Sequence, residues 1–87
     1  MPRSHRSDID TLVQEARAVE MLANEAEVEP TKLQEYWALA ADLITLTADI
    51  EAFHAASPAA TYEDPQLLEL RRRLRQITSR LADVSVP

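Results

Sequence analysis

The sequence contains no glycine and no cysteine. Phosphate-cradling loops and the strained turn beneath a serine nucleophile depend on glycine, so dinucleotide-binding, P-loop and nucleophile-elbow enzymes are excluded. Without cysteine there is no disulfide, no thiolate nucleophile and no cysteine-ligated zinc. No residue pattern identifies a catalytic group or a cofactor site. We therefore expect a protein that is not an enzyme and that carries no cofactor.

Long apolar runs are also missing, and no segment of the sequence resembles a signal peptide. No stretch approaches the roughly 20 continuous apolar residues of a membrane-spanning helix. Residues 1–7 are polar and basic, unlike a signal peptide. We therefore expect a cytoplasmic protein without a membrane partner, with a flexible tail at residues 1–7. Arginine greatly outnumbers the single lysine and alanine is abundant, which indicates a GC-rich bacterial genome.

Aromatic residues are scarce, and leucine and alanine occupy the repeating apolar positions instead. In the first of three such segments the apolar positions alternate three and four residues apart, as on one face of an α-helix. This row is Ile9, Leu12, Ala16, Val19, Ala23 and Ala26. Ser7 is a suitable N-cap, and Pro30 disfavours helical geometry in the residue before it. We predict a first helix over residues 8–28.

The second predicted helix, residues 31–56, has two apolar rows. One row is Tyr36, Leu39, Leu43, Leu46, Ile50 and Phe53. The other row is Trp37, Ala41, Ile44 and Ala48, followed by Glu51. Because both rows have helical spacing, we expect each row to face one neighbouring helix, which places Trp37 in the core.

The third predicted helix covers residues 65–83, with Asp64 as its N-cap and Pro65 in its first turn. Its apolar row is Leu67, Leu70, Leu74, Ile77, Leu81 and Val84. If the chain reverses direction near Pro30 and again near Ala60, the apolar rows of successive helices lie opposite each other along their length. This agreement predicts an all-α, up-down-up antiparallel three-helix bundle with coiled-coil-like contacts. Residues 8–84 are expected to form one domain, with a frayed end at 85–87.

The net charge of −6 is unevenly distributed. The chain before the third helix contains thirteen acidic and four basic residues, and the remainder contains two acidic and five basic residues. The predicted packing places Glu15 beside Arg75 and Glu20 beside Arg80. The acidic first helix and the basic third helix are therefore expected to be complementary neighbours. Few apolar residues are available to this contact, so it is the weakest side of the predicted bundle.

Residues 71–75 contain four arginines, which is one feature of a nucleic-acid-binding helix. Four arginines in five helical positions cannot share one face, and no aromatic residues lie among them for base stacking. The rest of the chain is acidic and would repel phosphate. We therefore expect arginines that are solvated or paired within the chain, and the acidic surface of a protein partner is the alternative. Nucleic acid is the least favoured partner.

Glu51 and His54 have the Glu-x-x-His spacing, which places both side chains on one helix face. Helical di-iron proteins use two such units together with two further glutamates, and this chain has one unit. A symmetric dimer would supply two units, and the predicted packing brings Asp8, Asp10 and His5 to the same end of the bundle. A metal-binding carboxylate and histidine bundle formed across a dimer is therefore an alternative function. No metal is predicted for the single chain.

The function that the sequence favours is a non-enzymatic protein–protein interaction module: an adaptor, a regulator or an assembly subunit. We expect self-association as a homodimer or a higher homo-oligomer, because small chains often gain stability in this way. The acidic end of the first helix suits a basic partner, so an antitoxin- or immunity-like neutraliser is a second alternative. The predicted partner-binding residues are Glu20, Met21, Leu22, Glu25, Glu27, Leu68 and Arg72.

Overall fold

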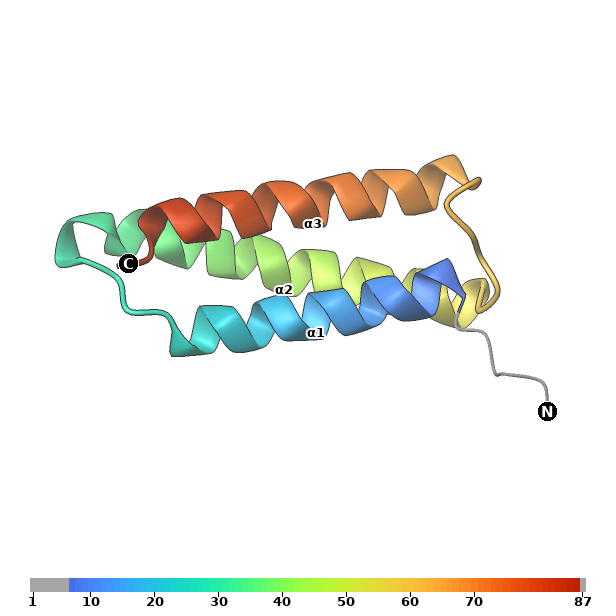
Figure 1. Cartoon of the computed structure of the whole chain (residues 1–87), viewed down its shortest axis with the longest axis horizontal. Helices are drawn as coiled ribbons and strands as arrows, with labels where there is room; N and C mark the ends of the chain where they lie inside the picture. The colour runs from blue at the N-terminus through green and yellow to red at the C-terminus, as the bar shows by residue number, and fades with distance from the viewer. Residues whose placement is uncertain (1–6, 87) are drawn as a thin grey trace.

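The computed structural model describes residues 7–86, which form three antiparallel helices in an up-down-up bundle (Figure 1). The helices are α1 (Asp8–Glu25), α2 (Leu33–Ala56) and α3 (Pro65–Val84), and a short 3-10 turn, η1 (Pro30–Lys32), precedes α2. The predicted all-α fold is confirmed. None of these helices has both the length and the apolar character that crossing a membrane requires.

Side-chain caps fix where α1 and α3 begin. The Ser7 hydroxyl oxygen accepts a hydrogen bond from the Asp10 backbone N–H at 3.3 Å, and the Asp64 carboxylate accepts one from the Gln66 backbone N–H at 2.9 Å. Each bond satisfies an amide that has no partner inside its own helix. α2 has no such side-chain cap, and the η1 turn leads into it instead.

α1 ends at Glu25, earlier than the predicted boundary at residue 28. The backbone of Ala26 is extended, and Val28 forms an isolated antiparallel bridge with Ser85. The Val86 N–H donates a hydrogen bond to the Glu27 carbonyl oxygen at 2.7 Å. The connection from α1 to η1 is therefore paired with residues just beyond α3, where the sequence predicted a frayed end.

The core is one cluster of aliphatic side chains from all three helices. α1 contributes Ile9, Leu12, Val13, Ala16, Val19 and Ala23; α2 contributes Leu39, Leu43, Leu46 and Ile50; α3 contributes Leu67, Leu70, Leu74, Ile77, Leu81 and Val84. Tyr36 and Phe53 are half-buried against it. The predicted apolar rows of α1 and α3 and the Tyr36–Phe53 row of α2 are therefore core rows, except that Ala26 lies beyond the end of α1 and outside the core.

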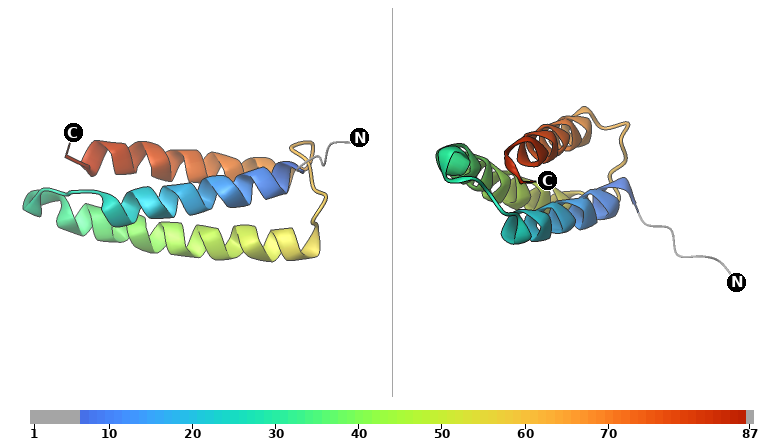
Figure 2. Two further views of the ribbon diagram at one scale, coloured as in Figure 1. Left: turned by 60° about the horizontal axis from the view of Figure 1, so that its bottom comes forward. Right: turned by 60° about the vertical axis from the view of Figure 1, so that its left-hand side comes forward.

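The prediction that the second row of α2 packs on α1 is wrong. Trp37 and Ile44 are 61 % and 66 % exposed, and Ala41 and Ala48 are exposed with them. The left view in Figure 2 shows α1 and α3 on the same side of α2. In a triangular bundle the directions to the two neighbours differ by only roughly 60°, so one apolar stripe about 100° wide faces both. We call the exposed row Trp37, Ala41, Ile44 and Ala48 the α2 stripe.

Candidate partner-binding surfaces

An open groove runs between the parallel helices α1 and α3, because α3 packs more extensively on α2 than on α1. Near the C-terminal ends of both helices the groove has a volume of about 590 Å³. It is lined there by Leu22, Glu25, Ala26, Glu27, Thr78, Leu81, Ala82, Ser85 and Val86. The charged residues of this lining both come from the α1 side, so one wall is acidic and the other is neutral.

The groove continues toward the middle of the bundle as a shallower hollow of about 410 Å³. Thr78 lines both parts, so the two hollows adjoin each other. The buried side chains of Val19 and Leu74 contribute to the apolar lining of this second part. Glu15 and Arg75 line its opposite sides, in agreement with the prediction that these two residues lie beside each other. We call the two parts together the α1–α3 groove.

The structure brings together part of the predicted partner-binding set. Leu22, Glu25 and Glu27 line the α1–α3 groove, and Leu22 is 59 % exposed. Met21, adjacent in sequence, is also exposed, and Glu20 is half-exposed.

Leu68 and Arg72 lie apart from this group, near the start of α3. Leu68 is exposed, but at a rise of about 1.5 Å per residue it is roughly 20 Å along the helix from Leu81 in the groove. These two residues therefore do not belong to the same surface as Leu22.

Arginines of the 71–75 run contact other side chains of the chain. Arg72 donates two hydrogen bonds to the Glu69 carboxylate, at 2.9 and 2.6 Å, and this contact lowers the pKa of Glu69. The Arg71 guanidinium lies 4.5 Å from the centre of the Tyr62 ring, a cation–π contact. Burial raises the pKa of the Tyr62 hydroxyl. These contacts agree with the expectation of arginines paired within the chain.

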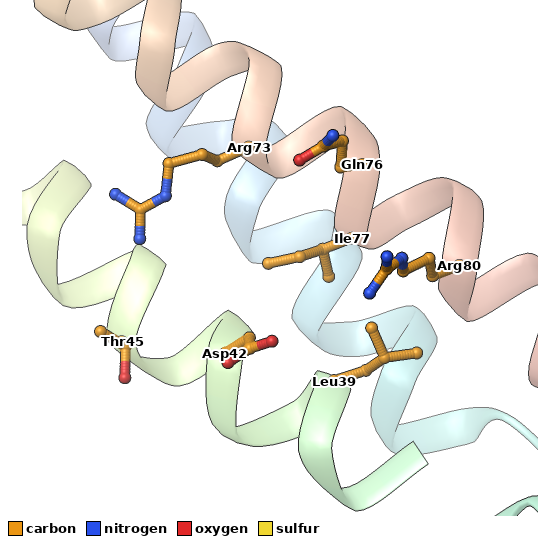
Figure 3. A pocket seen from close by; sticks show the side chains of 7 residues that line it. All are labelled: Leu39, Asp42, Thr45, Arg73, Gln76, Ile77 and Arg80. Atoms are coloured by element: carbon orange, nitrogen blue, oxygen red, sulfur yellow. The ribbon is translucent and has the colours of Figure 1, made fainter. Parts of the chain in front are cut away.

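Acidic residues of α2 face two other arginines of α3, Arg73 and Arg80. Arg73 donates to the Asp49 carboxylate at 3.4 Å. Arg73 and Arg80 extend from α3 beside Asp42 of α2, in a hollow of about 340 Å³ (Figure 3). Arg80 therefore lies on the α2 side of α3, and the predicted pairing of Glu20 with Arg80 is wrong.

The signal for this charge pairing was present in the sequence and was missed. Glu35, Asp42 and Asp49 follow one another at intervals of seven residues on α2, and Arg73 and Arg80 have the same interval on α3. Equal intervals of seven keep side chains along one helix edge. The complementary charges are thus concentrated between α2 and α3, whereas the sequence prediction placed them between α1 and α3.

The Glu51–His54 unit lies at the end of the bundle where α1 begins. His54 Nε2 is 2.6 Å from Asp10 Oδ1, and Glu51 and Arg17 line the same hollow of about 380 Å³. Asp8, also predicted near this site, instead accepts a hydrogen bond from the Tyr62 backbone N–H at 2.8 Å.

Within residues 7–86, no three or more histidine and acidic side chains are placed to hold one metal ion. The predicted contribution of His5 lies outside the described residues. The structure therefore gives the Glu51–His54 unit a local partner, Asp10, and does not add the further ligands that a metal site needs.

No protein-family model, no curated protein and no solved structure matches this chain. Two surfaces, the α1–α3 groove and the α2 stripe, carry exposed apolar side chains, and they lie on different sides of the bundle. Exposed apolar patches of this kind typically mark contacts with other proteins.

Proposed function

We propose that this chain is a non-enzymatic helical interaction module, an adaptor, regulator or assembly subunit, whose α1–α3 groove binds an amphipathic helix of a partner protein. The observation that carries the proposal is the groove of two adjoining hollows between parallel helices, with apolar side chains in its lining and the exposed Leu22 at its edge. An amphipathic helix laid in such a groove buries its apolar face and completes a four-helix arrangement.

The charges around the groove specify the chemistry of that helix. Glu25 and Glu27 lie on the α1 side, and the opposite wall carries the neutral Thr78 and Ser85. Near the C-terminal ends of the two helices, a partner helix with lysine or arginine along one edge would pair with this acidic wall, and the opposite wall there carries no charge. Arg75 lies farther along the groove, opposite Glu15. Such complementarity mainly accelerates association and sharpens specificity. An antitoxin- or immunity-like neutraliser of a basic protein is a narrower form of this proposal, and its gene would lie beside that of the toxic partner.

We also propose that the chain acts in the cytoplasm and self-associates. The absence of cysteine fits a reducing compartment, because small secreted domains commonly depend on disulfides. Self-association is supported by the α2 stripe, which leaves two large apolar side chains, Trp37 and Ile44, exposed on a small domain.

The groove can be tested by comparing single substitutions at exposed positions. Wild-type protein, the Leu22→Glu variant and the Leu68→Glu variant each serve as immobilised bait in an affinity pull-down. The proteins that co-purify with each bait are identified by mass spectrometry. Leu68 is an exposed leucine outside the groove, which makes it the matched control. Circular dichroism establishes that all three proteins have the same helix content.

A protein lost from Leu22→Glu but retained by Leu68→Glu is then purified and titrated. The expected result is at least a tenfold weaker affinity for Leu22→Glu, because a charge replaces an apolar side chain that the partner would bury. Binding of the wild type should also weaken at higher salt. A partner that binds both variants with equal affinity, or the absence of any protein captured differently, would refute binding in the groove.

A further inference from the structure

We infer that the α2 stripe is the contact surface of an antiparallel homodimer, in which α2 of one chain packs against α2 of a second copy. The inference rests on the proposed self-association and identifies the surface and geometry responsible. Its starting point is exposure: Ile44, Met21 and Trp37 are the three most exposed large apolar side chains of residues 7–86. Two of these three belong to the stripe.

The stripe is free of charge as well as apolar. Between Trp37 and Ala48 the one charged residue is Asp42, which points toward the α3 side in the arginine-lined hollow (Figure 3). The flanking positions Ala38 and Thr45 are exposed and neutral. Burying this face therefore removes no charge from water, and the large desolvation cost of burying an ion is avoided.

The stripe is also complementary to itself when one copy is reversed. Its members alternate large and small at intervals of four, three and four residues: Trp37, Ala41, Ile44, Ala48. In an antiparallel pair centred between Asp42 and Leu43, Trp37 of each chain lies opposite Ala48 of the other, and Ala41 lies opposite Ile44. A two-fold axis generates each of these contacts twice from the same patch. Large side chains packed against small ones fill the space between helices without voids.

A parallel pair would not fill that space. It would place Trp37 against Trp37 and Ile44 against Ile44, and leave gaps where Ala41 meets Ala41. It would also bring two copies of Glu51 together at the next stripe position. In the antiparallel pair Glu51 lies opposite Gln34, so no like charges meet. Both steric and electrostatic arguments therefore select the antiparallel arrangement.

The contact is short, which limits the area that it buries. From Trp37 to Ala48 the helix extends for only about 17 Å at 1.5 Å per residue. Such a contact buries less than the roughly 800 Å² per partner of a standard stable complex. We therefore expect a dissociation constant in the micromolar range. Because the stripe faces away from α1 and α3, dimerisation leaves the α1–α3 groove accessible.

Dimerisation is tested by following mass and fluorescence together over concentrations from nanomolar to high micromolar. Trp37 is the only tryptophan in the chain, so its emission reports on this surface alone. The expected result is a doubling of mass by sedimentation equilibrium and a shift of Trp37 emission to shorter wavelength over the same concentration range. The Ile44→Glu variant should remain monomeric throughout, whereas Leu68→Glu, with its added charge outside the stripe, should dimerise like the wild type.

The register is tested with single cysteines, which is direct because the chain has no other cysteine. A mixture of Trp37→Cys and Ala48→Cys chains should form a mixed disulfide. Ala48→Cys alone should not cross-link, because the two copies of residue 48 lie about 16 Å apart along an antiparallel pair. A disulfide requires Cα atoms within about 7 Å.

Each contrary outcome has a separate meaning. A wild-type chain that stays monomeric at high micromolar concentration refutes both this inference and the proposed self-association. A dimer that persists in Ile44→Glu refutes the inference alone, because the chain then self-associates through another surface. Efficient cross-linking of Ala48→Cys to itself refutes the antiparallel register. None of these results bears on partner binding in the α1–α3 groove.

Discussion

His54 in the last turn of α2 and Asp10 in the first turn of α1 are joined by a contact of 2.6 Å between Nε2 and Oδ1. Neighbouring polar contacts hold the same end of the bundle. The Asp8 carboxylate accepts from the Tyr62 backbone N–H, and the Ser7 hydroxyl donates to a carbonyl oxygen of the connection between α2 and α3. The start of α1 is therefore attached by hydrogen bonds to α2 and to the connection between α2 and α3, as well as by apolar packing.

The Asp10 contact predicts a specific loss of stability in acid. Hydrogen bonding to Ser7, followed by that to His54, lowers the pKa of Asp10 below its ordinary value of 3.8. Because the folded pKa is below the unfolded one, the carboxylate stabilises the fold above the unfolded pKa, and this contribution disappears as the pH falls through the folded pKa. Thermal denaturation between about pH 5 and pH 2 should therefore show a steeper loss for the wild type than for Asp10→Asn. Equal slopes would contradict the assigned contact.

Adjacent residues of α2 should respond very differently to truncation. Leu43 is 3 % exposed and Ile44 is 66 % exposed. Leu43→Ala should lower the free energy of unfolding by about 2–5 kcal/mol, because it removes a buried side chain and leaves a cavity. In dilute, monomeric protein Ile44→Ala should have little effect. Urea denaturation measures both, and comparable losses would mean that both rows of α2 are buried.

The Thr47 side chain offers a stabilising substitution. Its hydroxyl oxygen is buried and has no hydrogen-bond partner within the described residues. Thr47→Val keeps the shape and removes the unsatisfied group, so the free energy of unfolding should rise by about 1 kcal/mol. Thr45→Val, at an exposed position on the same helix, is the matched control and should change stability little. A loss of stability in Thr47→Val would show that the hydroxyl is satisfied in solution.

Tyr36 connects α2 to the end of α1. Its hydroxyl donates a hydrogen bond to the Ala23 carbonyl oxygen at 2.5 Å. Tyr36→Phe should lower the free energy of unfolding by about 0.5–1.5 kcal/mol, the usual net contribution of such a bond. Tyr62→Phe is the control, since the Tyr62 hydroxyl makes no side-chain hydrogen bond within residues 7–86 and the ring remains available to Arg71. Chemical denaturation of both variants should separate them, and equal stability would refute the Tyr36 bond.

The periodic apolar rows predicted most of the core. Their spacing identifies one face of each helix, and the positions where the chain reverses determine which residues of successive helices lie opposite each other. Leu46 and Leu74 are buried for this reason. Spacing does not say in which direction around the helix axis a row points relative to two neighbours at once. Trp37 has the same helical spacing whether it faces α1 or water, and only the placement of α1 and α3 on one side of α2 decides between them.

Contacts between distant residues account for the other differences. α1 ends at Glu25, and the extended segment that follows pairs with the end of the chain through Val28 and Ser85. Neither local sequence identifies the other as its partner. The acidic residues near the end of α1 could be recognised as a candidate site from their charge alone. That Leu22 and Glu25 line a groove whose other wall is α3 depends on how far α1 and α3 separate, which is set by three-dimensional packing.

The position of α2 on one side of the bundle has a consequence for valency. An antiparallel pair of chains joined back to back through α2 would carry two α1–α3 grooves that open in opposite directions. A single partner molecule with two recognition helices on a flexible tether would reach both grooves of one dimer only if the tether spanned the whole dimer. Two separate partner molecules, by contrast, could each occupy one groove. Such a dimer would act as a crosslinker, and its concentration would control whether partner molecules are bound singly or brought together in pairs.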